Sequence, residues 1–92
     1  MTPNTVLLHR RAQRDIRDIT DKATLRLVEE ALDKLSADAH PWRTHDLGQL
    51  AGRKNTYRIR VGDRRIIYVI RSPGDILVLR IAPRGEAYKG MD

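Results

Sequence analysis

The stretch YRIRVGDRRIIYVI, residues 57–70, constrains the fold more than any other part of this chain. Apolar and basic residues alternate on both sides of Gly62-Asp63, a pair suited to a tight turn, and this pattern predicts a β-hairpin. A two-residue loop at that pair places Arg60 directly opposite Arg65. Like charges opposite each other weaken a sheet. The pair of arginines therefore needs an explanation other than stability.

A second turn, SPGD at residues 72–75, leads to a third strand that begins at Ile76. If this turn also has a short loop, Arg80 lies opposite Ile67. Because successive side chains alternate between the two faces of a sheet, the three strands have one apolar face and one basic face. The face expected beneath the helices holds Tyr57, Ile59, Val61, Ile66, Tyr68, Ile70, Leu77, Leu79 and Ile81. The opposite face holds Arg58, Arg60, Arg65 and Arg80 beside Ile67, Val69, Ile76 and Val78.

We call Arg58, Arg60, Arg65 and Arg80 the arginine face. One interpretation is that these side chains only provide solubility, with their methylene stems covering apolar neighbours. A solubilising surface usually mixes charges of both signs, however, and no Asp or Glu is interleaved here. Guanidinium groups bind a phosphodiester through two parallel hydrogen bonds, so the arginine face predicts a phosphate site. Further cations that could extend this site are Arg43, Arg53, Lys54, Arg84 and Lys89.

The N-terminal half predicts a short strand and two helices. The apolar run TVLLH at residues 5–9 is typical of a brief strand at a sheet edge. Helical spacing follows, with Thr20 or Asp21 as the N-cap that divides two helices. The expected buried positions are Ala12, Ile16, Ile19 and Ala23, then Leu25, Val28, Ala31, Leu32 and Leu35. Residues 36–55 have no sustained period and predict a long connection.

Composition limits the classes of function. With 92 residues the chain is one small domain, and 18 Lys and Arg against 12 Asp and Glu give a net charge of +6. That charge favours phosphate-rich partners, with an acidic protein surface as the alternative. The chain has no Cys and only three scattered His, so we expect no disulfide, metal site or cofactor. No signal peptide or membrane-spanning run is present, which predicts a cytoplasmic protein without a membrane partner.

Two stretches, LAGRKNTYRIRVGDRRIIYVI and ILVLRIAPRGEAY, resemble the RelE branch of the RelE/ParE toxin superfamily from bacterial toxin-antitoxin systems. The likeness is most specific over residues 47–89, and the order of the expected N-terminal elements agrees. It implies a single RelE-like domain of α+β class, with two N-terminal helices packed on a small antiparallel sheet in the order β-α-α-β-β-β. It also implies a cognate antitoxin as partner, in a toxin-antitoxin hetero-oligomer.

Members of this branch enter the ribosomal A site and cut the messenger RNA there, inhibiting translation. The resemblance therefore implies an endoribonuclease, an mRNA interferase whose partners are the ribosome and mRNA. The ribose 2′-hydroxyl attacks the adjacent phosphate without a metal ion, leaving a 2′,3′-cyclic phosphate and a 5′-hydroxyl. Such a reaction needs a proton acceptor, a proton donor and stabilisation of the added phosphate charge. The last requirement accounts for a cluster of arginines.

Each site residue is carried over by its position in the resemblance. Arg58 and Arg60 fall where the family has basic residues on the first hairpin strand. Arg65 matches the arginine that holds the scissile phosphate, and Arg84 matches the arginine that serves the leaving group. Tyr88 matches the tyrosine that stacks on or orients the nucleotide. The implied catalytic set is thus Arg60, Arg65, Arg84 and Tyr88, and the implied RNA-binding set is Arg53, Lys54, Arg58, Arg80 and Lys89.

Two departures from the family leave the acid-base roles open. Arg60 stands where some members have a lysine proposed as the general base, and a guanidinium is effectively always protonated. Pro83 stands where many relatives have a histidine. Two other functions therefore remain: a ParE-like inhibitor of DNA gyrase, and a non-catalytic nucleic-acid-binding protein or degenerate toxin. Cleavage of mRNA within the A-site codon would separate the first function from both alternatives.

Overall fold

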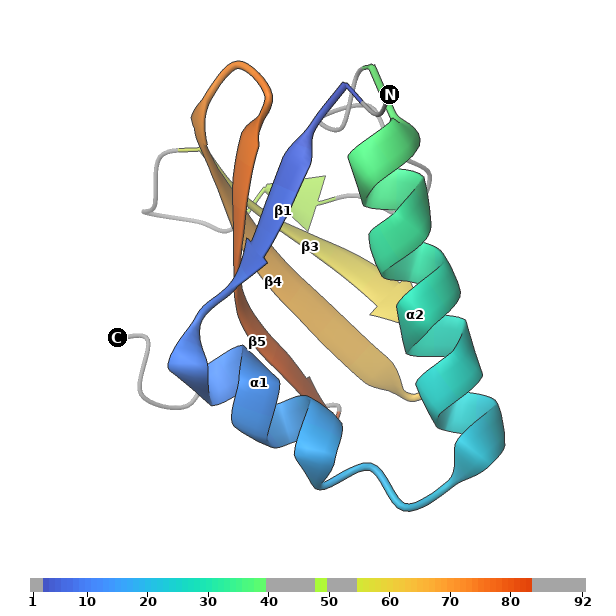
Figure 1. Cartoon of the computed structure of the whole chain (residues 1–92). Coiled ribbons are helices and arrows are strands. Elements are labelled where there is room, and N and C mark those ends of the chain that lie inside the picture. Colours follow the sequence, from blue (N-terminus) through green and yellow to red (C-terminus); the bar gives the residue numbers. More distant parts are fainter. Residues whose placement is uncertain (1–2, 40–47, 50–54, 84–92) are drawn as a thin grey trace.

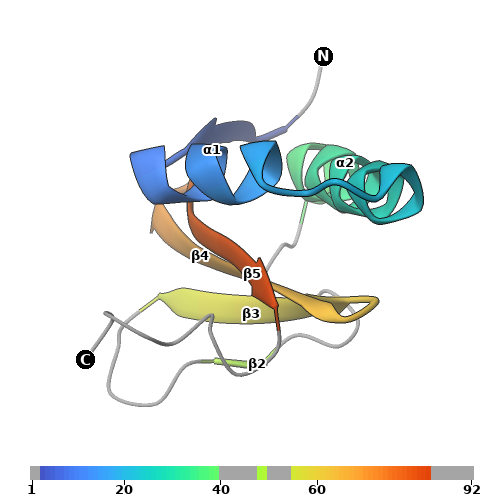
Figure 2. The ribbon, with the colours of Figure 1, turned by 90° about the horizontal axis from the view of Figure 1, so that it is seen from below.

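The computed structural model describes residues 3–39, 48–49 and 55–83 (Figure 1). Two helices lie together on one face of a twisted sheet, as the view from below shows clearly (Figure 2). This arrangement confirms the predicted α+β class and the predicted order of elements, with one short strand added. The elements are β1 Thr5–Leu8, α1 Arg10–Arg17, α2 Lys22–Ala37, β2 Gly48–Gln49, β3 Thr56–Val61, β4 Arg64–Ser72 and β5 Asp75–Pro83.

The sheet is mixed. Its strand order is β1-β5-β4-β3-β2, and only the β1–β5 pair is parallel among the described strands. A parallel pair requires a long crossover, and the two helices form part of the chain between these strands. The expectation of a purely antiparallel sheet is therefore corrected at this pair, whereas the expected edge position of β1 is confirmed. Strand β2 lies within the expected long connection and pairs with β3.

The β3–β4 hairpin has the predicted register. Arg60 pairs with Arg65 and Val61 pairs with Arg64, so the loop consists of Gly62 and Asp63. Gly62 has a φ of 60°, and Asp63 does not take a positive φ. A positive φ at only the first loop residue is the pattern of a type II′ turn, which suits the twist of a hairpin. The face-to-face arginines thus follow from turn chemistry and from the alternation of the strands.

The register of β4 with β5 differs from the prediction. Arg80 pairs with Ile67 as expected, but Tyr68 pairs with Val78, which leaves Leu79 as an extra residue in β5. Such an insertion is a β-bulge. A second irregularity, between Ile70 and Ser72 of β4, compensates for the first, so that Ser72 pairs with Asp75 at the turn.

The bulge changes which side chains of β5 form the core. A shift of one residue moves a side chain to the other face of a sheet, so Ile76 and Val78 are fully buried beneath the helices. The prediction that Leu77 and Leu79 occupy these places is wrong for this reason. The buried core consists of Ala12, Ile19, Val28, Leu35, Ile59, Ile66, Tyr68, Ile76, Val78 and Ile81.

The helices begin and pack largely as predicted. Asp21 is the N-cap of α2 and accepts hydrogen bonds from the backbone N–H groups of Ala23 and Thr24. His9 caps α1 through Nδ1, which accepts from the Arg11 N–H at 3.1 Å. The expected buried face is confirmed except at Ala23, which is exposed in the first turn of α2. Within the described ranges, neither helix has the length and hydrophobicity needed to cross a membrane.

Candidate functional site

The arginine face spans three neighbouring strands. One row across the sheet runs from Arg60 through Arg65 to Ala82, and the next row runs from Arg58 through Ile67 to Arg80. The register therefore confirms that the four arginines occupy positions on one face of the sheet, opposite the helices.

The central arginine of this face is nearly buried. Arg65 is only 9% exposed, whereas Arg58 and Arg60 are exposed on the neighbouring strand. Ile67 and Ala82 are fully buried beside Arg65, although they lie outside the core beneath the helices. In the part of the chain that the structure describes, no carboxylate forms an ion pair with Arg60 or Arg65. A desolvated guanidinium beside another arginine is suited to receive an anion.

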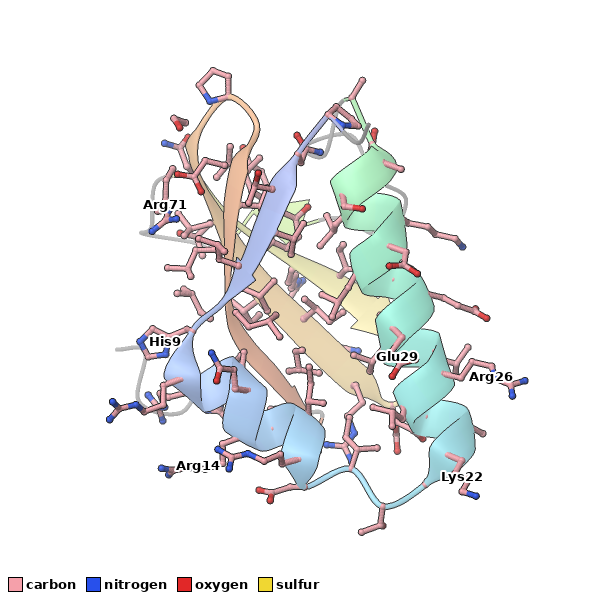
Figure 3. All side chains as sticks on the ribbon, viewed as in Figure 1. His9, Arg14, Lys22, Arg26, Glu29 and Arg71 are labelled. Atoms are coloured by element: carbon pink, nitrogen blue, oxygen red, sulfur yellow. The ribbon has the colours of Figure 1, made fainter. Side chains whose placement is uncertain are left out.

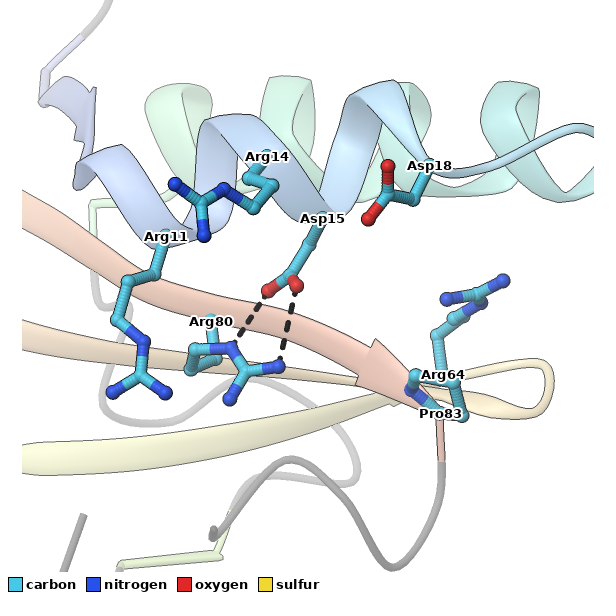
Figure 4. Close-up of a pocket in the computed structure, with 7 residues that line it drawn as sticks. All are labelled: Arg11, Arg14, Asp15, Asp18, Arg64, Arg80 and Pro83. Carbon is cyan, nitrogen blue, oxygen red and sulfur yellow. Dashed lines mark hydrogen bonds and ion pairs between the residues drawn. The ribbon is translucent and has the colours of Figure 1, made fainter. Parts of the chain in front are cut away.

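Arg80 belongs to the arginine face by register, but its guanidinium binds α1. Its Nε donates to Asp15 Oδ2 at 2.8 Å and its Nη2 donates to Asp15 Oδ1 at 3.2 Å (Figure 4). The two side chains are 13% and 15% exposed, so most of the pair is shielded from water. Arg80 therefore has a carboxylate partner, which offsets the charge that it contributes to the arginine face.

The same carboxylate protects the end of β5. Strand β1 pairs with β5 only as far as Val78, so the last part of β5 has no strand beside it on that side among the described residues. There the Ile81 N–H donates to Asp15 Oδ2 at 2.8 Å. Pro83 has no N–H to leave unpaired, and proline is tolerated on edge strands for this reason. A proline thus suits the edge position that residue 83 occupies.

A cleft of about 450 Å³ opens between α1 and the end of β5 (Figure 4). The sequence did not reveal this cleft, because its walls come from segments far apart in the chain. The available signals were the arginines spaced three apart in α1 and the pair of arginines that begins β4. The lining residues are Arg11, Arg14, Asp15, Asp18, Arg64, Arg80 and Pro83.

The outer surface of α2 has a different character from the arginine face. Lys22 and Arg26 point outward from this helix (Figure 3), and Glu29 is also exposed on it. Charges of both signs therefore occur along it, as on an ordinary solvated surface. This contrast supports the interpretation that the cations of the arginine face are gathered for binding.

Five of the predicted site residues lie outside the described residues, and their roles stay predictions. They are Arg53, Lys54, Arg84, Tyr88 and Lys89. The same is true of Arg43 as an additional cation. Among the residues that are described, no group of three His, Cys, Asp or Glu side chains is placed to hold a metal ion.

Comparison with known proteins assigns the chain to a family. Residues 6–88 match the family model for the ParE toxin of the type II toxin-antitoxin system parDE. The chain is also 31% identical over 85 residues to the RelE1 toxin-family protein of Methanocaldococcus jannaschii, covering 91% of this chain and 93% of that one.

Solved structures agree with the sequence matches. The fold is similar to that in the RelE–RelB complex of Pyrococcus horikoshii, with a TM-score of 0.73, 31% identity, and coverage of 95% of this chain and 100% of that one. It is also similar to the toxin-antitoxin complex RelBE2 of Mycobacterium tuberculosis, with a TM-score of 0.70, 29% identity, and coverage of 91% and 94%. The chain therefore belongs to the RelE/ParE superfamily and is a RelE-like toxin of a type II toxin-antitoxin system.

Proposed function

We propose that this toxin is a ribosome-dependent endoribonuclease that cuts messenger RNA in the ribosomal A site and so inhibits translation. The observation that carries the proposal is the nearly buried Arg65 directly opposite Arg60. Neither guanidinium has an ion pair within the described residues, although the protein loses stability by placing them together. A phosphodiester bound between them would supply the missing negative charge.

The reaction we propose is an internal transfer within the RNA. The ribose 2′-oxygen forms a bond to the adjacent phosphorus, and the bond from phosphorus to the 5′-oxygen breaks. The products are a 2′,3′-cyclic phosphate and a 5′-hydroxyl, so one proton leaves the 2′-oxygen and one reaches the 5′-oxygen. Arg65 stabilises the charge on the phosphoryl oxygens, and Arg84 serves the leaving oxygen. Arg60 adds charge stabilisation, because a guanidinium cannot accept the proton.

RNA contacts around the reacting phosphate complete the proposed site. Arg58 belongs to the row of the sheet next to the Arg60–Arg65 row. Arg80 lies at the β5 end of that same row, but Asp15 holds its guanidinium, so Arg80 would bind RNA only after leaving Asp15. We propose that Tyr88 stacks on or orients the nucleotide, and that Arg53, Lys54 and Lys89 bind the RNA backbone. The nucleophile and the leaving group both belong to the RNA, so the mechanism has no step for a cofactor.

A cognate antitoxin is the second proposed partner. The related proteins from Pyrococcus horikoshii and Mycobacterium tuberculosis are toxin-antitoxin complexes. The net charge of +6 favours an acidic or amphipathic segment that covers the arginine face. We therefore propose a toxin-antitoxin hetero-oligomer in the cytoplasm, from which the free toxin is released to act on ribosomes.

Inhibition of DNA gyrase is the second candidate function, because the matching family model describes a ParE toxin. Gyrase inhibition would require a protein-binding surface, whereas the described arginine face is suited to a phosphate. Mapping the 5′ ends of mRNA on programmed ribosomes after adding purified toxin separates the two. Cuts within the A-site codon support the nuclease. Intact mRNA, together with stalled DNA replication in cells that express the toxin, supports gyrase as the target.

The site assignment is tested with Arg65→Ala and Arg84→Ala. We expect each variant to lose cleavage by about 100- to 1000-fold, because each removes a group that stabilises transition-state charge. Each should also relieve growth arrest. Arg71→Ala is the matched control, since Arg71 is an exposed arginine of the same strand as Arg65 and pairs with Asp75. If both site variants stayed fully toxic with a native circular dichroism spectrum, the assignment would be wrong.

A further inference from the structure

We propose that the cleft between α1 and the end of β5 is a second RNA-binding site, which holds backbone phosphates outside the arginine face. The inference rests on the proposed function only in taking RNA as the ligand. The site itself rests on the geometry of the cleft, which is formed by described residues (Figure 4).

Arginines reach this cleft from two elements. Arg11 and Arg14 are three positions apart on α1, a spacing that puts both on one side of a helix. Arg64 comes from the start of β4 at the other end of the cleft (Figure 4). An RNA backbone lying along the cleft would therefore meet guanidinium donors at both ends, from Arg11 and Arg14 at one end and from Arg64 at the other (Figure 4).

Arg64 has a buried hydrogen-bond donor without an acceptor among the described residues. Its Nε is buried, and among the described residues no acceptor binds it. A buried donor without an acceptor is unfavourable, and a guanidinium has only donors to offer. Rotation of the Arg64 side chain, which lines the cleft, would bring this Nε to a phosphate oxygen bound there and so provide the acceptor that the described part of the protein does not supply.

The carboxylates of the cleft do not cancel its positive charge. Asp15 is occupied by Arg80 and by the Ile81 N–H. The remaining charges of the described lining are then three arginines, Arg11, Arg14 and Arg64, and one carboxylate, Asp18. None of these four side chains forms an ion pair with another described residue. The cleft therefore has an excess of positive charge that an anion would neutralise.

The lining favours nucleic acid over a protein segment. Pro83 is the only uncharged residue among the described residues that line the cleft, so a docking helix or strand would find little apolar surface on which to anchor. A sugar-phosphate backbone needs no such anchor, because phosphate contacts supply most of its affinity. Arg64 and Arg65 are neighbours on opposite faces of β4, which puts the cleft and the arginine face at the same end of the sheet.

Binding of an RNA oligonucleotide with 2′-O-methyl riboses tests the inference, since this RNA cannot be cut by 2′-hydroxyl attack. We expect Arg11→Gln/Arg14→Gln to weaken binding by about tenfold in about 0.1 M salt, measured by fluorescence anisotropy. The slope of log affinity against log salt should become shallower by about 0.7 to 1.4, because each phosphate contact on single-stranded RNA contributes about 0.7 and up to two arginine–phosphate pairs no longer form. Arg11→Lys/Arg14→Lys should recover part of the affinity, because lysine keeps the charge but not the planar fork.

Arg10→Gln/Arg17→Gln is the matched control. It removes the same two charges from α1, but neither residue lines the cleft. We expect its affinity to change by less than about twofold, because exposed charges are largely screened at this salt concentration. Equal losses in the two double variants would overturn the inference, since they would show a general charge effect.

Further comparisons identify the ligand and separate this inference from the proposed function. If the Arg11/Arg14 variant lost binding to an oligo-glutamate peptide but not to RNA, the cleft would be a protein site and the inference would be wrong. If the variant lost RNA binding while the wild type still cut no mRNA on ribosomes, the cleft would be supported and the nuclease rejected. If Arg65→Ala lost cleavage while the Arg11/Arg14 variant kept full RNA affinity, the nuclease would be supported and the cleft rejected.

Discussion

At the scale of single residues, Asp15 joins α1 to β5 through one carboxylate. That carboxylate accepts two hydrogen bonds from Arg80 and one from the Ile81 N–H. Asp15→Asn would keep the size of the side chain but remove its charge and one acceptor oxygen. The Arg80 side chain, which is 13% exposed to solvent, would then lose its negatively charged partner. We expect the free energy of unfolding to fall by about 2 to 3 kcal/mol, measured by urea denaturation.

The Arg71–Asp75 pair is the control for that prediction. Its distance is the same 2.8 Å, but its side chains are 42% and 36% exposed. Arg71→Ala should therefore cost less than about 0.5 kcal/mol, because exposed ion pairs contribute little. If the two substitutions were equally destabilising, the shielding of Asp15 from water would not be what gives that pair its strength.

The sequence could predict that Arg60 lies opposite Arg65, but it could not predict the contact of Arg80 with Asp15. Arg60 lies opposite Arg65 because alternation and a two-residue turn fix the register locally, within one hairpin. The contact of Arg80 with Asp15 joins residues 65 positions apart. Alternation assigns Arg80 to the far face of the sheet, and only the open edge of β5 lets its side chain turn to α1. That contact depends on where β1 stops, which no local pattern specifies.

At the scale of elements, the bulge at Leu79 shows the limit of alternation as a predictor. The run ILVLRIA is apolar at nearly every position, so both of its faces fit a core equally well. Nothing in such a run distinguishes Ile76 and Val78 from Leu77 and Leu79. The structure selects the first pair because the bulge shifts the register beside Tyr68. The helices were easier to predict, since charged residues mark their outer faces and Asp21 marks a start.

The N-cap of α2 gives a pH-dependent prediction. A hydrogen bond from the Thr24 hydroxyl, and then those from the Thr24 and Ala23 N–H groups, lower the pKa of Asp21 below 3.8. A carboxyl whose pKa is lowered by folding stabilises the protein above its unfolded pKa. That contribution is lost as the pH falls through the folded pKa, which lies below 3.8.

Asp21→Asn isolates this effect, because asparagine is also a good N-cap but does not titrate. Urea midpoints of the wild type and the variant should be close at about pH 7. As the pH falls below about 4, the wild type should lose more stability than the variant does, after both are corrected for the other carboxyls they share. Parallel loss in the two proteins would show that Asp21 does not contribute to acid unfolding.

At the scale of the whole molecule, the sequence predicts the order of elements but not the partner of β1. Each predicted helix and strand has its own local pattern, whereas the parallel pairing of β1 with β5 joins the two ends of the fold. That pairing also makes β5 central for half of its length and an edge for the other half. The cleft and the Arg80–Asp15 contact both occur on the edge half, so these two features, which the sequence did not predict, share one topological cause.

If the toxin is the proposed nuclease, its distribution of charge predicts how the cleavage rate depends on the ribosome. The described part of the arginine face offers cations to stabilise a phosphate, and Arg60, opposite Arg65, is effectively always protonated and so cannot accept a proton. Much of the rate must then come from holding the 2′-oxygen in line with the bond that breaks, and a ribosome can hold an A-site codon in that way. We expect mRNA on programmed ribosomes to be cut at least about 100 times faster than the same mRNA alone. Rates compared by primer extension at equal RNA and toxin concentrations check this, and equal rates would mean that the protein itself provides the missing proton acceptor.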